Sequence, residues 1–145
     1  MDRTNGPAVI AVAAILSAAW APEAVPPVSA SEPKDVSLVQ LIANSAEWHG
    51  KLVRVDGYCR LEFEETVLYL HEEDSEHLIT RNGVWLRLGW PIPEKYRDVG
   101  DGYVLVEGVF DADQAGHMGM FSGEIKDVRR IQRLRSRKEL ARPPR

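Results

Sequence analysis

The segment from Tyr69 to His77 reads YLHEEDSEH and holds two of the four histidines of the chain around a run of acidic side chains. Imidazole and carboxylate groups are common ligands of zinc and similar divalent ions. With His117, from the glycine-rich stretch AGHMGMFSG, the candidate metal ligands are His71, Asp74, His77 and His117. Such a set could hold a divalent ion, zinc being the best match, or serve a metal-dependent hydrolase.

The spacing of these residues does not match a known metal motif. The zincin pattern needs two histidines one helical turn apart, whereas His77 follows His71 by six residues. An EF-hand loop needs alternating oxygen ligands and a glycine at a fixed place, and the segment has neither. The simpler interpretation is that a strand ends at His71 and a solvated acidic loop follows. We therefore expect no cofactor and keep the metal site as the alternative.

A second candidate site is a patch of aromatic and basic side chains on the expected strands, made of Tyr58, Arg60, Tyr69, Trp85 and Arg87. Stacking rings and cations suit single-stranded nucleic acid, but an acidic surface disfavours phosphate. A small molecule, a neutral saccharide, a peptide or an envelope protein fits better, and packing between strands is the competing explanation. The sequence contains no nucleophile elbow and no phosphate-binding loop.

Charge is distributed unevenly along the chain. Residues 31–125 hold 8 Lys and Arg against 18 Asp and Glu, whereas residues 126–145 hold 9 against 2. The acidic part is a poor partner for nucleic acid. The basic end, residues 135–145, is expected to be a solvated, disordered tail, and contact with lipid or nucleic acid is the alternative.

The first thirty residues are typical of a secretory signal. The apolar run from Ala8 to Ala21 is shorter than the about 20 residues that span a bilayer, and it fits the apolar region of a signal peptide. Cleavage after Ala30 is favoured over cleavage after Ala21. We therefore predict an exported protein, periplasmic or secreted, in which the lone Cys59 is a buried small hydrophobe.

The remaining pattern predicts a β-rich domain over residues 35–134 after a linker at 31–34. A short helix is expected over 35–44, capped by Asp35 or Ser37. Strict alternation predicts a long strand over 51–64 that bends at Gly57 and buries its odd-numbered side chains. Further strands are expected over 66–71, 84–88 and 103–111, with a glycine-rich loop over 111–123. Residues 123–134 could form a helix, but the β-branched residues and the preceding Ser-Gly favour a strand with a bulge. Five strands and one N-terminal helix indicate an all-β fold, a small OB-fold-like barrel.

Five stretches of this sequence stand out together: VSLVQLIAN, WHGKLVRVDGY, LEFEETVLYLHEEDSEH, NGVWL and YVLVEGVFDADQAGHMGMFSGEIKDV. With them, the chain from Val36 to Arg133 resembles a group of uncharacterised exported bacterial proteins with a predicted OB-fold-like domain. The resemblance implies fold and export but no activity. We expect an exported, non-catalytic binding or interaction module of the bacterial cell envelope. The alternative is a divalent-metal-binding protein or metal-dependent hydrolase that uses His71, His77 and His117.

Overall fold

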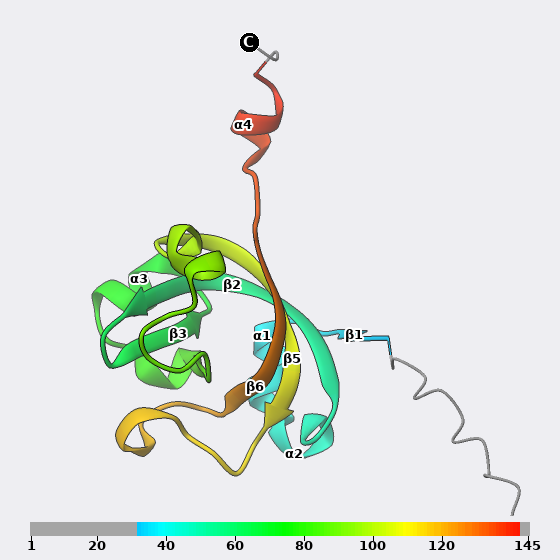
Figure 1. Ribbon diagram of the computed structural model, residues 1–145. Helices are drawn as coiled ribbons and strands as arrows, with labels where there is room; N and C mark the ends of the chain where they lie inside the picture. The colour runs from blue at the N-terminus through cyan, green and yellow to red at the C-terminus, as the bar shows by residue number, and fades with distance from the viewer. Residues whose placement is uncertain (1–31, 143–145) are drawn as a thin grey trace, which may run out of the picture. The chain divides into compact units, whose positions relative to one another are not determined.

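The alternating segment after residue 50 forms the longest strand of the structure, a computed structural model that describes residues 32–142. The domain is mostly β, with a few short helices (Figure 1). Its strands are β1 (Lys34–Asp35), β2 (Leu52–Glu62), β3 (Glu65–Tyr69), β4 (Gly83–Leu86), β5 (Gly102–Asp111) and β6 (Glu124–Arg133). Its helices are α1 (Leu38–Ala43), α2 (Ser45–Trp48), α3 (Glu72–Glu76) and α4 (Arg137–Leu140), with 3-10 turns η1 (Thr80–Asn82), η2 (Glu94–Val99) and η3 (His117–Gly119).

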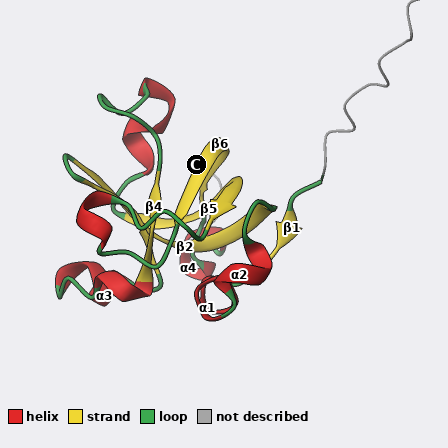
Figure 2. Cartoon of the chain, turned by 90° about the horizontal axis from the view of Figure 1, so that it is seen from below, coloured by secondary structure: helices red, strands yellow, loops and turns green. Residues whose placement is uncertain are grey.

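The strands pair in a closed order. β2 pairs with β3, β3 with β4, β4 with β6, β6 with β5, and β5 returns to β2. All of these pairs are antiparallel except β4 with β6. The short β1 adds a parallel pair to the start of β2. Figure 2 shows α3 and the α1–α2 pair at two separate places beside the strands, where α3 contacts β3 and α1 contacts β2.

The predicted alternation of β2 places its side chains correctly over most of the strand. Val53, Val55 and Cys59 are fully buried, and burial raises the pKa of the Cys59 thiol to about 12. A thiol with that pKa stays protonated at neutral pH, as expected of a core residue. Val53, Val55 and Cys59 share the main core with side chains of the other strands, of α1, and of η2 and the chain just before it. These side chains are Leu38, Leu41, Leu68, Val84, Leu86, Ile92, Tyr96, Val104, Val106, Phe110, Ile125 and Ile131.

Several local predictions hold. Ser37, not Asp35, caps α1: its side chain accepts from the amide of Gln40, and the Gln40 side chain accepts from the Ser37 amide. Residues 123–134 form a strand, β6, with a bulge opposite Gly108. The Val104, Val106 and Phe110 face of β5 is fully buried, as its alternation predicts.

Other local predictions are wrong, and the boundaries explain why. The acidic run is a helix, α3, rather than a loop, because β3 ends at Tyr69 and His71 occupies the N-cap position. Phe63 is exposed because β2 ends at Glu62 and Glu64 turns the chain with φ +61°. The basic tail contains one helical turn, α4, and the linker contributes to β1.

The expected signal peptide, residues 1–30, lies outside the described residues. Within the described part, none of the helices has the length and apolar character needed to cross a bilayer.

Candidate ligand-binding pocket

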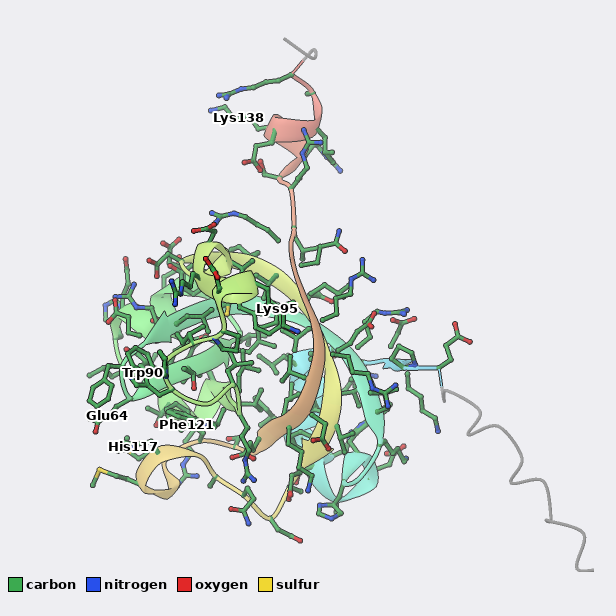
Figure 3. The ribbon with its side chains drawn as sticks, viewed as in Figure 1. Glu64, Trp90, Lys95, His117, Phe121 and Lys138 are labelled. Atoms are coloured by element: carbon green, nitrogen blue, oxygen red, sulfur yellow. The ribbon has the colours of Figure 1, made fainter. Side chains whose placement is uncertain are left out.

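A pocket with a volume of about 330 Å³ opens beside β3 and β4. Three separate segments build it: the turn between β2 and β3 with the start of β3, the chain through and after β4, and the loop between β5 and β6. Its lining residues are Phe63, Glu64, Thr66, Trp85, Leu86, Arg87, Gly89, Trp90 and His117. Glu64, Trp90 and His117 lie on the same side of the domain, with Phe121 nearby (Figure 3).

The pocket has two aromatic walls of different character. Phe63 and Trp90 form an edge-to-face pair with centroids 5.2 Å apart, and they are 64% and 58% exposed. Trp85 is half-buried. The His117 ring is stacked on its indole with ring centroids 6.2 Å apart, and the Phe121 ring lies against it with centroids 5.4 Å apart. Because the rings of His117 and Phe121 cover the indole of Trp85, the exposed aromatic surface of the pocket comes from Phe63 and Trp90.

The backbone around Trp85 explains how this wall forms. A β-carbon added at Gly116 would lie 2.5 Å from Trp85 Cβ, and Gly116 has φ +62°. Glycine therefore allows the β5–β6 loop to lie directly against the indole and to place His117 on it. On the neighbouring strand, the Thr66 hydroxyl donates to the Leu86 carbonyl at 2.9 Å, so the floor is fixed by a buried hydrogen bond.

One cation of the pocket is held by a buried anion. Arg87 Nε forms an ion pair with Glu124, whose side chain is only 5% exposed, while the Arg87 side chain is 55% exposed. Glu124 Oε1 has no other hydrogen-bond partner among the described residues, so Arg87 is its counter-ion. The pair fixes the guanidinium and leaves its terminal N–H groups available to a ligand acceptor.

Comparison with known proteins gives one similar structure. Neither a family model nor a curated protein matches the sequence. Among solved structures, the chain is similar to a DUF3299 family protein from Pseudomonas aeruginosa, with 11% identity and a TM-score of 0.47. The match covers 73% of this chain and 99% of that one.

The predicted ligand patch is divided between two places. Trp85 and Arg87 line the pocket. Tyr58 and Arg60 lie in a separate hollow beside α3, where Tyr58 donates to Glu72 at 3.3 Å and Arg60 pairs with Asp101 at 2.8 Å.

The fifth member of the patch, Tyr69, is buried. It belongs to a second apolar cluster with Tyr58, Val67 and Phe121, and Trp85 packs against that cluster. Its hydroxyl donates to Glu65 at 3.0 Å, and burial followed by the charge of Glu65 raises the pKa of Tyr69. The ring is therefore a packing element rather than a surface for a ligand.

The predicted metal ligands do not converge on a common point. Asp74 is buried and accepts from the His71 amide at 3.0 Å and from Asn82 Nδ2 at 2.8 Å, which fixes the first turn of α3. His77 contacts the Glu73 carbonyl, and His117 lies on Trp85. No three of the four form a ligand group within the described residues, so the metal site stays a prediction without a preformed centre.

The structure does bring together another set of potential ligands. The ligand atoms of His49, Asp111 and Asp113 all lie within 4.8 Å of one another. They already have partners: the Ala112 amide donates to His49 Nδ1, the Asp113 amide to Asp111 Oδ1, and Lys126 Nζ to Asp111 Oδ2 at 2.7 Å. We interpret this group as a polar cluster that joins the end of α2 to the end of β5.

This cluster gives a prediction for stability against pH. The hydrogen bond from Lys126, with the amide of Asp113, lowers the pKa of Asp111, so the folded state favours the carboxylate. That contribution is present above the unfolded pKa of about 4 and is lost as the pH falls through the lower folded value. Asp111→Asn should therefore lower the free energy of unfolding by about 1–2 kcal/mol at pH 7. Urea unfolding should show this difference shrinking below about pH 4.

The matched control for this prediction is Asp113→Asn. The side chain of Asp113 is 83% exposed, so its charge is screened by solvent. The control should change stability little at either pH. An equal loss in both variants, or a loss for Asp111→Asn that is independent of pH, would contradict the assigned role of the Lys126 contact.

Sequence reasoning missed Phe63, Glu64, Thr66 and Trp90 as pocket residues. Alternation assigned Phe63 to the core, because nothing in the pattern marks where β2 ends. A signal for Trp90 exists: it precedes Pro91 and follows Gly89, so it lies in a turn-rich connector, where an aromatic residue is seldom needed for packing.

Proposed function

We propose that this chain is an exported, non-catalytic binding module of the cell envelope that takes a neutral saccharide in the pocket of Phe63, Trp85 and Trp90. The observation that carries the proposal is the pair of exposed rings, Phe63 and Trp90, beside a guanidinium fixed by a buried carboxylate. Sugar rings have apolar faces that pack on aromatic rings and hydroxyl groups that need both donors and acceptors. Arg87 supplies donors, and Glu64 supplies an acceptor.

We also infer that the domain is an OB-type barrel. The closed pairing order from β2 through β3, β4, β6 and β5, with its single parallel pair, matches the five-stranded Greek-key arrangement. In that fold the second and third strands and two neighbouring loops form the usual binding face. The pocket lies on the corresponding β3 and β4, between the β2–β3 turn and the β5–β6 loop. This analogy supports the location of the site and not the identity of its ligand.

Charge and hydrogen bonding favour a saccharide over the other classes. Nucleic acid is disfavoured because Glu64 lines the pocket and the domain around it is acidic. A peptide added as a strand is disfavoured because the backbone amides of Trp85 and Arg87 already donate to Gly123 and Ile125. The backbone of β4 therefore offers no free edge at the pocket with which a peptide strand could pair.

The test is titration of the full chain with neutral oligosaccharides of glucose and of N-acetylglucosamine, followed by tryptophan fluorescence. Trp90→Ala should weaken binding at least tenfold, which corresponds to about 1.4 kcal/mol, and should change stability little because the ring is exposed. The matched control is Tyr103→Ala, which removes an exposed ring outside the pocket.

The proposal predicts a loss in the Trp90 variant that the Tyr103 variant does not show. Saturable binding that is equal in both variants would place the site elsewhere. Binding of a proline-rich peptide in place of both sugar series, lost on Trp90→Ala, would keep the pocket and overturn the ligand class. The absence of binding to sugar and peptide alike would overturn the proposal.

A further inference from the structure

The C-terminal part of the structure carries a concentrated positive charge. Residues 129–142 hold seven basic side chains and one acidic one: Arg129, Arg130, Arg133, Arg135, Arg137, Lys138 and Arg142, with Glu139. We call this stretch the basic segment. Figure 1 shows it leaving β6, with α4 standing apart from the strands, and residues 132–142 are all exposed.

Most of these cations are not neutralised by the acidic domain. Within the described residues, the basic segment makes one ion pair with an acidic side chain of the domain, between Arg130 and Glu107 at 3.4 Å. Arg133 and Arg135 bond to backbone carbonyls and form no ion pair with an acidic side chain of the domain within the described residues. An acidic domain would attract a loose basic tail, so a segment that remains extended presents its charge to a partner.

A hollow lies where the basic segment leaves the strands. It has a volume of about 330 Å³, and its lining combines basic, hydroxyl and apolar side chains. Its residues are Gly102, Tyr103, Arg133, Leu134, Arg135, Ser136 and Glu139. The Glu139 carboxylate accepts from the Ser136 amide at 2.7 Å, which favours its charged form, and the two arginines outnumber it, so the hollow keeps a net positive charge.

Exposed apolar side chains accompany the cations. Tyr103 and Leu134 are 44% and 38% exposed at the hollow, and Leu140 on α4 is 63% exposed. Leu134 and Leu140 lie among the cations of the segment, and Tyr103 of β5 lies beside them at the hollow. Basic side chains next to exposed apolar ones favour the headgroup region of a membrane. A flat anionic surface can be reached by this projecting end while the acidic domain stays away from it. A polymer that wraps around the domain would meet the acidic surface instead.

We propose that the basic segment docks this protein on an anionic lipid surface, with a phosphate headgroup in the hollow between Arg133 and Arg135. This site is separate from the saccharide pocket and does not depend on it. Each cation near an anionic bilayer contributes roughly a fivefold gain in affinity. Removing four of them should therefore weaken binding on the order of a hundredfold or more.

The test is co-sedimentation of the full chain with vesicles of phosphatidylcholine, with and without phosphatidylglycerol. The excess binding to anionic over neutral vesicles isolates the electrostatic part from any contribution of the apolar N-terminal run. That excess should fall steeply between 0.1 M and 1 M salt, because the screening length falls from about 10 Å to about 3 Å. The test variant replaces four cations beyond the strands with glutamine: Arg135, Arg137, Lys138 and Arg142.

The control variant removes the same charge from the acidic domain. It replaces four exposed or half-exposed cations with glutamine: Lys34, Lys51, Lys95 and Arg97. Figure 3 shows Lys95 and Lys138 in these two separate places. The proposal predicts loss of the excess in the test variant and its retention in the control. It is overturned by equal loss in both, by no excess in the wild type, or by tighter binding to a single-stranded DNA oligomer that the test variant loses.

Discussion

Alanine in place of Gly57 is expected to lower the free energy of unfolding by about 3 kcal/mol, the upper part of the range for overpacking. A β-carbon at this position would lie 2.5 Å from the Tyr69 carbonyl oxygen and 2.9 Å from Leu68 Cγ. The nearer atom belongs to the backbone of β3, so a rotamer change cannot relieve the contact. Gly57 also pairs with Val104 of β5, which holds β2 from its other side. The close approach of β3 to β2 at this point therefore depends on the missing side chain.

Gly100→Ala is the matched control for this prediction. Gly100 has φ −63°, and the nearest atom to an added β-carbon would be Leu61 Cβ at 3.3 Å, with the Leu61 amide nitrogen at 3.6 Å. Its backbone conformation suits alanine, so the change should alter stability by less than about 1 kcal/mol. Urea unfolding of the two variants measures the difference in midpoint and slope. Equal midpoints would show that β2 and β3 separate easily, contrary to the crowding at Gly57.

The alternation of residues 51–61 was sufficient to predict β2 because a half-buried strand repeats every two residues. Gly57, where the sequence predicted a bend, is a crowded point of β2, because an added β-carbon would meet β3. The end of β2 was not predictable in the same way. Phe63 continues the alternation perfectly, and only the left-handed backbone of Glu64 takes it out of the sheet. The alternation of side chains alone does not indicate where the backbone makes such a turn.

The candidate site was less predictable than the fold because its residues come from three segments that are separate in the chain. The patch prediction found Trp85 and Arg87, since both lie on the outward side of one strand. It could not separate them from Tyr58 and Tyr69, which are likewise aromatic residues on expected strands. The distinction depends on α3 and Phe121, which cover those tyrosines in the folded chain. The acidic run likewise suggested ligands, whereas Asp74 is used inside its own helix.

Phe110→Ala is expected to have the largest effect on stability, a loss of about 3–5 kcal/mol in the free energy of unfolding. The ring is fully buried, and a β-carbon added at Gly123 would lie 2.5 Å from it, so glycine there lets β6 pack directly on the ring. Alanine would leave a cavity that paired strands on both sides of β5 cannot close. Since small domains have total stabilities of about 5–15 kcal/mol, thermal unfolding should show a markedly lower midpoint.

Phe63→Ala removes a phenylalanine that alternation assigned to the core but that lies at the pocket. Comparing it with Phe110→Ala therefore separates the effect of core packing from the effect of ligand binding. Phe63 is 64% exposed, and its described ring contact is with Trp90. The change should cost no more than about 0.5 kcal/mol in stability. It should nevertheless weaken saccharide binding in the fluorescence titration, because it removes half of the exposed aromatic wall. Destabilisation equal to that of Phe110→Ala would make Phe63 part of the core. Unchanged binding at unchanged stability would show that the wall of Phe63 and Trp90 does not contact the ligand.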